Sequence, residues 1–295
     1  MQINASMVKE LRTRTGAGMM ECKKALEARG GDIESAIEAL RKAGVAKADN
    51  RAARIVAEGV IRASVASGAS QAAMVEVNCE TDFVAKGDEF VAFAQAVADG
   101  VLQHAPADVD ALAGLHILGD EAIPIEDRRQ ALIAKLGENI QVRRFDLMRS
   151  DEGYIGLYLH GGRIGVMVDL HGADKGLAKD IAMHVAASRP LSVSEQEVPA
   201  ELIEREKAIF AAQAEQSGKP PEIIEKMVQG RLKKYLAEIT LLGQRFVKDP
   251  DKTVGELLQA SKAEVRRFTR FEVGEGIEKK TDNFADEVMA QVKES

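Results

Sequence analysis

Aromatic residues and cysteines are both scarce in this sequence of 295 residues. Aromatic residues make up 4% and tryptophan is absent, so the stacking platforms that bind single-stranded nucleic acid are poorly supplied. The two cysteines, Cys22 and Cys79, are too few for a disulfide framework and lack the paired spacing of a zinc site. We therefore expect both cysteines to be reduced packing residues.

Long apolar runs are also missing, since no segment approaches the roughly 18 residues that a membrane-spanning helix needs. The first residues, MQINASMVKEL, lack the basic and apolar regions of a signal peptide. These features predict a cytoplasmic protein without a membrane segment. The five histidines are scattered without the spacing of a metal-binding motif, so no metal site is expected.

The apolar content is nevertheless sufficient for two or three packed units, because hydrophobic residues make up 45% of the chain. The formal net charge is −7. Residues 1–54, in contrast, carry 11 Lys and Arg against 7 Asp and Glu. This basic N-terminal segment favours an acidic partner.

Residues 4–43 carry three short helical patterns, separated at Gly16 and at Gly30 with its neighbour. The second pattern places Met19 at helical spacing with Cys22 and Leu26, on one face of the helix. Asp32 stands where an N-cap belongs, before a third helix that we expect to end at Gly44. Three such helices predict a compact module, and a helical linker can follow it.

Two stretches repeat the order of a strand hairpin followed by a helix. The first has strands in GVIRASVA and AAMVEVNC and a helix in DEFVAFAQAVADGVLQ. The second has a hairpin in GYIGLYLHGGRIGVMVDL and a helix in KGLAKDIAMHVAAS. We infer an internal duplication. The segment IEDRRQALIAKLGENIQVRRFDLM, between the copies, predicts one helix and a strand leading into the second copy.

Residues 199–243 predict a different structure, two long amphipathic helices joined by SGKPP. Gly218 can end the first helix, and Pro220 or Pro221 can start the second. An antiparallel helical hairpin that protrudes from the core is expected. The last residues, TDNFADEVMAQVKES, predict a C-terminal helix.

No motif of enzymatic chemistry is complete in this chain. The segment GAGMMECKK lacks the phosphate-loop pattern, and a tight hairpin turn explains the glycines of GGRIGV. The segment VGEGIEKK lacks the third glycine of a dinucleotide-binding loop, and no serine lies in a nucleophile elbow. We expect no catalytic residue, no cofactor and no direct binding of nucleotide.

The connector CETDFVAKGD, between the first hairpin and its helix, leaves two interpretations open. In one, Thr81 or Asp82 caps the helix and Phe83 folds back as a hydrophobic staple. In the other, Asp82 and Phe83 project into a partner. Both hold if Thr81 caps while Phe83 points outward. The connector is about three residues longer than its counterpart in the second copy.

Four stretches carry a resemblance to a known family, in order along essentially the whole chain: KELRTRTGAGMMECKKAL, TDFVAK, HGGRIGVMV and RFEVGEGIEK. Through these motifs the chain resembles bacterial elongation factor Ts. The resemblance implies a guanine nucleotide exchange factor for the translational GTPase elongation factor Tu. Such a factor binds the GDP-bound and nucleotide-free GTPase and promotes release of GDP, so that GTP can enter.

The same resemblance implies roles for particular residues. It implies that Thr81, Asp82, Phe83 and Val84 dislodge the magnesium ion between the GTPase and the phosphates of its nucleotide. Loss of this cation leaves the phosphate charge less neutralised and GDP less tightly held. The resemblance implies that the ring of Phe83 displaces groups of the GTPase by its volume. The carboxylate of Asp82 would make a polar contact near the same place.

Further residues are expected to contact the GTPase by resemblance. They are Arg12, Met19 and Met20 in the N-terminal module, and His160 and Gly161 in the second hairpin. Packing in the module core is the alternative role of the two methionines, although neighbouring helical positions point about 100° apart. An exposed methionine suits a deformable contact surface.

The expected fold class is α+β. It comprises an N-terminal three-helix, UBA-like module, a duplicated core of small antiparallel sheets backed by helices, an inserted antiparallel helical hairpin forming a coiled coil, and a C-terminal helix. The predicted parts are the module at 1–55, the core N-subdomain at 56–141, the C-subdomain at 142–192 and 242–276, the hairpin at 193–241 and the C-terminal module at 277–295.

Two other classes of function compete with nucleotide exchange. An RNA-binding or ribosome-associated protein is suggested by the basic N-terminal segment, and its retention on RNA would fall steeply with added salt. The net charge of −7 disfavours this class. An enzyme is disfavoured by the missing catalytic motifs, and labelled GDP alone would test for it, because an exchange factor binds no nucleotide itself.

Overall fold

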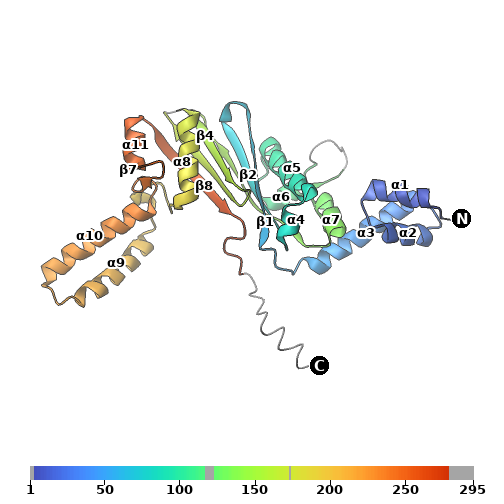
Figure 1. The fold of residues 1–295 in the computed structure, drawn as a ribbon, viewed down its shortest axis with the longest axis horizontal. Helices are drawn as coiled ribbons and strands as arrows, with labels where there is room; N and C mark the ends of the chain where they lie inside the picture. Colours follow the sequence, from blue (N-terminus) through green and yellow to red (C-terminus); the bar gives the residue numbers. More distant parts are fainter. Residues whose placement is uncertain (1–2, 117–122, 173, 279–295) are drawn as a thin grey trace, which may run out of the picture.

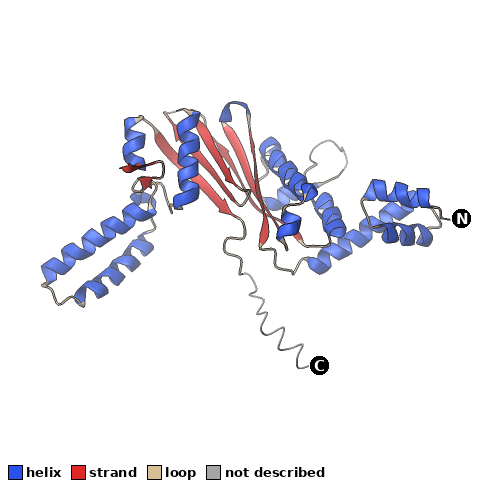
Figure 2. Ribbon diagram, viewed as in Figure 1, coloured by secondary structure: helices blue, strands red, loops and turns tan. Residues whose placement is uncertain are grey.

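The computed structural model describes residues 3–116, 123–172 and 174–278. A three-helix N-terminal module lies at one end of the molecule, two antiparallel sheets lie in the middle, and a helical hairpin lies at the opposite end (Figure 1). The sheets are antiparallel and the helices lie on their outer sides or beyond them (Figure 2). This mixture confirms the α+β class.

The N-terminal module consists of α1 (Ala5–Thr15), α2 (Met19–Ala28) and α3 (Ile33–Arg51). Its core is formed by Leu11, Cys22, Leu26 and Ala36, all fully buried. Asp32 accepts a hydrogen bond from the Ser35 N–H at 3.2 Å, which is the N-terminal capping contact expected from the sequence. The prediction of three helices in this segment is confirmed.

The predicted end of the third helix at Gly44 is wrong, because α3 continues to Arg51. Gly44 is buried and faces Ala134 of α7 (Ile125–Leu136). The guanidinium of Arg51 donates to the Ile133 carbonyl at 3.2 Å. Packing on α7 therefore offsets the cost, about 1 kcal/mol, of a glycine inside a helix, and the helical linker connects the module to the core.

Each half of the core is a three-stranded antiparallel sheet covered by a helix. The first sheet has the order β1 (Glu58–Val65), β2 (Gln71–Cys79), β3 (Ile140–Arg149), and α5 (Asp88–His104) covers it. The second has the order β4 (Gly153–His160), β5 (Ile164–His171), β8 (Glu264–Glu272), and α8 (Lys175–Ser188) covers it. The two predicted hairpins with their helices are confirmed.

The two sheets pack face to face, and the central strands are buried on both faces. In β2, Val75 and Val77 pack towards α5, whereas Met74 packs with Met167 of β5 between the sheets. This is the two-residue alternation of a strand. A Cβ at Gly165 would lie 2.5 Å from the Sδ of Met74, so only glycine permits this approach of the sheets.

A matching irregularity in the strands that pair with β2 and β5 supports the internal duplication, because β3 and β8 each carry one extra residue at the same place. The pairing of β2 with β3 shifts register immediately after Glu76, and the pairing of β5 with β8 shifts immediately after Asp169. Each carboxylate is buried and lies next to the side chain of the residue two positions further on. Asn78 donates to Glu76 at 3.1 Å, and the His171 Nε2 lies 3.1 Å from Asp169. The two copies share a bulge with a buried polar pair.

The helix and the strand predicted between the two copies are present as α7 and β3 (Ile140–Arg149), but β3 belongs to the first sheet and not to the second copy. In the structure β3 pairs along β2, with Arg149 opposite Gln71 and Ile140 opposite Cys79. The predicted boundary after residue 141 therefore falls inside β3. The partner strand lies more than 60 residues earlier in the chain, and such a pairing leaves no local pattern.

The predicted antiparallel helical hairpin is confirmed as α9 (Ala200–Glu215) and α10 (Pro221–Ile239). The rings of Phe210 and Tyr235 lie 6.1 Å apart, and Arg231 donates to Gln213 at 3.1 Å. These pairs run in opposite directions along the two helices. Pro221 starts α10 as expected. Figure 1 shows the hairpin projecting from the second half of the core.

The remaining short elements complete the two halves. They are η1 (Ser67–Ala69), α6 (Val109–Ala113), η2 (Glu195–Glu197), β6 (Arg245–Phe246), β7 (Asp249–Thr253) and α11 (Val254–Ala260). The helix predicted in residues 281–295 lies outside the described residues. Among the residues that the structure describes, none of the helices has the length and apolar character needed to span a bilayer.

Candidate partner-binding site

A four-residue helix, α4 (Asp82–Ala85), lies between β2 and α5, and we call residues Thr81–Val84 the tip. Thr81 is the N-cap, because its Oγ1 accepts a hydrogen bond from the Val84 N–H at 3.4 Å. Phe83 is 84% exposed, more than any other large hydrophobic side chain in the described part of the chain. Thr81 therefore caps while Phe83 points outward, and the predicted staple is wrong.

The helix α4 is held against the protein because its other apolar residues are anchored in the core. Ala85 is buried in the core of the first half, and Val84 packs against the same cluster. Eight residues separate β2 from α5, whereas three separate β5 from α8. The first copy is thus longer by five residues rather than about three. The extra length forms a turn of helix that turns Phe83 away from the core.

Asp82 carries the charge of the tip and is paired within it. Its carboxylate lies 2.6 Å from the Nζ of Lys86, one helical turn further on. The hydrogen bond from Lys86 and the charge of its ammonium group hold the pKa of Asp82 below the usual value. The tip therefore presents an ionised carboxylate next to an exposed aromatic ring.

The base of the tip contacts the loop that follows α7. Glu138, just after the end of α7, accepts hydrogen bonds from the N–H groups of Glu80 and Thr81 at 3.1 and 3.0 Å. The Thr81 hydroxyl donates to the same carboxylate at 2.5 Å. Glu138 is 57 residues from Thr81 in the chain, and no local sequence pattern indicates this contact.

The thiol of Cys79 lies beneath the tip and donates to the Thr81 carbonyl at 3.2 Å. Burial, with a smaller contribution from Glu138, raises its pKa to about 12. A thiol in this state is not a nucleophile near neutral pH. Cys22 is also free and buried, so the expectation of two reduced packing cysteines is confirmed.

The predicted contact residues of the N-terminal module are all exposed. Arg12 lies on α1, and Met19 and Met20 begin α2 with 58% and 65% of their surface exposed. Met19 lies on the same face of α2 as Cys22 and Leu26, as its spacing predicts, but it is not buried with them. It is the first residue of α2, at an end of the helix that the module core does not cover.

The second hairpin turn presents His160 and Gly161 to solvent. Gly161 and Gly162 have φ values of +57° and +70°, which favour glycine and confirm the tight turn. The carbonyl of Gly162 accepts a hydrogen bond from the N–H of Ile61 at 2.7 Å. The turn that carries the predicted contact residues is therefore docked on β1 of the first sheet.

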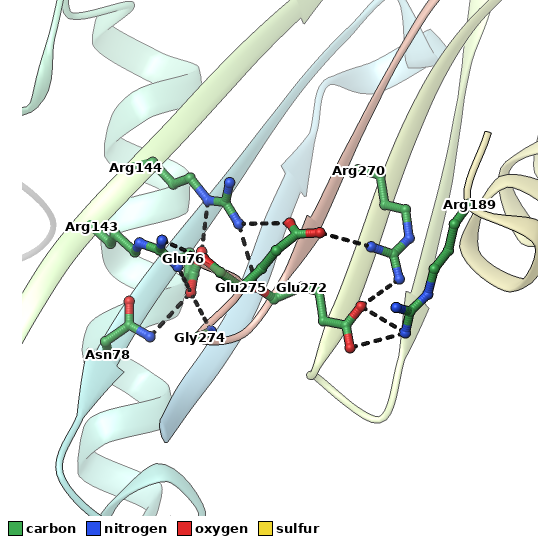
Figure 3. A network of polar contacts seen from close by, with 9 residues as sticks. All are labelled: Glu76, Asn78, Arg143, Arg144, Arg189, Arg270, Glu272, Gly274 and Glu275. Carbon is green, nitrogen blue, oxygen red and sulfur yellow. Dashed lines mark hydrogen bonds and ion pairs between the residues drawn. The ribbon is translucent and has the colours of Figure 1, made fainter. Parts of the chain in front are cut away.

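An ionic network around a buried carboxylate joins the first sheet to β8 and the segment that follows it (Figure 3). Glu76 is fully buried and accepts hydrogen bonds from Asn78, Arg143, Arg144 and the Gly274 N–H. Burial alone would raise the pKa of Glu76, but these donors outweigh it and hold the pKa below the usual range. The network connects the first sheet to the segment that follows β8.

The network continues to the second half through two further carboxylates (Figure 3). Arg270 lies 2.6 Å from Glu272 and 3.6 Å from Glu275, and Arg189 lies 2.9 Å from Glu272. Arg144 also lies 3.5 Å from Glu275. The two sheets are therefore held together by charge as well as by the apolar layer between them.

These positions define what the surface can do. The tip follows β2, the second hairpin turn packs against β1, and the linker after α3 reaches the base of the tip. Met19 and Met20 begin α2, in the N-terminal module, which lies at one end of the molecule beyond the core (Figure 1). Among the described residues no group of three or more His, Cys, Asp or Glu could hold a metal ion. The surface suits contact with another protein.

Comparison with known proteins gives a consistent result. A family model described as Elongation factor TS matches residues 80–275. The chain is 64% identical over 294 residues to a protein named Elongation factor Ts from Thioalkalivibrio sulfidiphilus, covering 99% of both chains. It is 59% identical over 295 residues to the protein of that name from Methylococcus capsulatus, covering 100% of both. The protein of that name from Legionella pneumophila (strain Paris) is 56% identical over 291 residues, with 99% of both chains covered.

Proposed function

The chain belongs to the elongation factor Ts family and is a guanine nucleotide exchange factor for elongation factor Tu, and we propose that its tip displaces the GTPase's magnesium ion. In this proposal Phe83 inserts between side chains of the GTPase. Asp82 makes a polar contact near the same place. Thr81 and Val84 hold the two in position, and this chain requires no active site of its own.

The exposure of Phe83 is the observation that carries the proposal. Burying a phenylalanine side chain stabilises a protein by roughly 1.5 to 3 kcal/mol, and Val84 beside it is packed inward. The free chain does not obtain this stabilisation from Phe83, because the ring is 84% exposed on an anchored helix. A partner that buries the ring recovers the stabilisation.

Exchange follows from thermodynamic coupling between the two ligands of the GTPase. If the tip and GDP cannot both occupy their best positions, each weakens the binding of the other by the same factor. Displacing magnesium removes positive charge from beside the phosphates, and GDP is released faster. GTP then binds the emptied site and displaces the exchange factor by the same reciprocity.

We further propose that contacts outside the tip supply the affinity. Arg12, Met19 and Met20 form one contact, and His160 with Gly161 forms another. The basic N-terminal segment suits an acidic surface on the GTPase. We also propose a cytoplasmic location, because translation elongation takes place there.

The finer architecture also belongs to this proposal. The resemblance to the family implies a UBA-like arrangement for the N-terminal module and a coiled coil for α9 and α10. The proposed parts are those predicted from sequence, with one change. The boundary inside the core lies after Arg149, because β3 belongs to the first sheet.

The test is the rate of GDP release from elongation factor Tu loaded with a fluorescent GDP analogue. We expect Phe83→Ala to slow the stimulated release while weakening binding to the GTPase only partly. Leu191→Ala is the matched control, because Leu191 is an exposed apolar residue outside the proposed contacts. Unchanged release with Phe83→Ala would assign the displacement to another part of the chain.

A further inference from the structure

Building on the proposed function, we infer that Glu138 is a positioning residue for exchange, whose carboxylate holds the base of the tip and thereby fixes the direction in which Phe83 projects. Glu138 itself lies at the end of α7, where Gly137 in the left-handed conformation ends the helix. The chain reverses there, and the carboxylate meets the residues that follow β2.

The contact is a clamp in which a single carboxylate, that of Glu138, accepts hydrogen bonds from three donors. One oxygen accepts from the N–H groups of Glu80 and Thr81, and the other accepts from the Thr81 hydroxyl. Hydrogen bonds to an ionised acceptor are roughly twice as strong as those between neutral groups. Two backbone N–H groups also fix the course of the main chain, which a contact to a side chain alone would not do.

The Thr81 hydroxyl links this clamp to the tip helix. Its hydrogen is donated to Glu138, and its oxygen accepts the Val84 N–H that starts α4. A helix of four residues is far below the length that is stable alone, about 12 to 15 residues. The N-terminal end of α4 is thus held through Thr81, and Thr81 is held by Glu138.

A reciprocal pair of contacts strengthens the same junction. The carboxylate of Glu80 accepts the N–H of Asn139 at 2.7 Å and lies 3.4 Å from Arg54. Glu80 therefore faces the junction and not the partner, which explains the extra acidic residue beside the tip. Its contribution is to hold the loop of Glu138 against the end of β2.

Asn139 extends the junction to the N-terminal module. Its side-chain amide is buried and donates to the carbonyls of Ala52 and Arg54, at 3.4 and 3.1 Å, in the linker after α3. The linker and the tip are consequently attached to the same two-residue loop. A partner that binds the N-terminal module meets the tip at a fixed separation.

Such an arrangement affects the rate at which the bound factor promotes GDP release more than it affects binding of the factor. Positioning errors of about 1 Å at a reacting group can lower a rate about 100-fold. Loss of the clamp leaves Phe83 present but free to point in several directions, whereas the other contact residues are unaffected. The maximal rate of GDP release should fall while the concentration of factor at half-maximal rate stays nearly constant.

The experiment measures GDP release from elongation factor Tu over a range of factor concentrations. For Glu138→Ala we expect a maximal rate about tenfold lower, with the half-saturating concentration changed by less than about twofold. Glu138→Gln should restore most of the rate, because one amide oxygen can still accept both N–H groups. Glu256→Ala is the control, since Glu256 also accepts hydrogen bonds at a helix N-terminus but lies on α11, and it should behave as the unmodified protein.

A second readout needs no partner. A nitroxide on Phe83→Cys reports motion of the tip, because the two native cysteines are buried. We expect its spectrum to show faster motion when Glu138→Ala is added and no change when Glu256→Ala is added. Unchanged motion together with an unchanged maximal rate in Glu138→Ala would overturn the inference. If Phe83→Ala slows release and Glu138→Ala does not, the positioning role of Glu138 is refuted and the proposed function of the tip stands. If Phe83→Ala has no effect on release, the proposed function of the tip is itself refuted.

Discussion

The carboxylate of Glu76 lies 2.7 Å from the Nε of Arg144 on the neighbouring strand, and none of the glutamate side chain is exposed. Arg144 stacks on Phe271 with its guanidinium carbon 4.3 Å from the ring centre. The ion pair therefore connects the central strand of the first sheet to the end of β8. It holds the two halves of the core together (Figure 3).

Replacing Glu76 by alanine should destabilise the protein strongly. Removing one partner of a buried ion pair leaves an uncompensated charge and typically costs about 3 to 5 kcal/mol. Chemical denaturation followed by circular dichroism measures the free energy of unfolding. Glu238→Ala is the control, because its pair with Lys234 is exposed and worth about 0.5 kcal/mol or less. Equal losses in the two variants would contradict a structural role for the network.

The stability of the second half should depend on pH through His184. This ring is buried, its Nδ1 accepts the N–H of Val247 at 3.2 Å, and its Nε2 lies 3.0 Å from the Gln244 oxygen. The ring is therefore neutral, with its proton on Nε2. Burial lowers the pKa of His184 below 6.5, even though the hydrogen bond to Gln244 acts in the opposite direction.

The unfolded chain consequently binds a proton at a higher pH than the folded chain does at this position. The free energy of unfolding should be constant with respect to His184 above about pH 6.5 and should fall as the pH drops below it. Thermal unfolding at several pH values measures the effect. In His184→Gln the decrease should be smaller, whereas His104→Gln, at an exposed position, should keep it. The same decrease in both variants would show that other groups cause it.

The pair between Asp82 and Lys86 predicts a titration change within the tip. In Lys86→Met the pKa of Asp82 should rise towards its ordinary value of 3.8, because the hydrogen bond and the positive charge are removed. Carbon-13 NMR of the side-chain carboxyl group, recorded as a function of pH, measures this pKa. Lys234→Met removes a lysine from α10 and should leave Asp82 unaffected. No rise in Lys86→Met would mean that the pair does not form in solution.

The hairpin of α9 and α10 should be dispensable for exchange. The segment before the hairpin lies beside the end of α10, since the Leu191 N–H donates to the Ile239 carbonyl at 2.7 Å and Ser192 pairs with Thr240. Residues 200–238 can therefore be replaced by a short Gly-Ser linker. We expect the stimulated rate of GDP release to stay about the same as for the full chain. A large loss of rate in a variant that still folds would place the hairpin in the exchange mechanism.

Local patterns predicted most of the elements around the site. The alternation of β2, the glycines after His160 and the proline at the start of α10 each act through neighbours in the chain, so they can be identified without knowing the fold. Thr81 could likewise be identified as a cap. The alternative of a folded-back ring could not be excluded from sequence, because a cap leaves the direction of the next side chain open.

Contacts between distant segments required the tertiary structure. The pairing of β3 with β2, the clamp of Glu138 on Thr81 and the pair of Glu76 with Arg144 join residues that lie more than 50 positions apart. None follows from the periodicity or turn chemistry of either segment. The sequence by itself determined which segments become helices and strands and which motif stands at their junction, because those choices depend on neighbouring residues. Only the packing of the two halves decided which charges meet, since this depends on the relative placement of whole sheets.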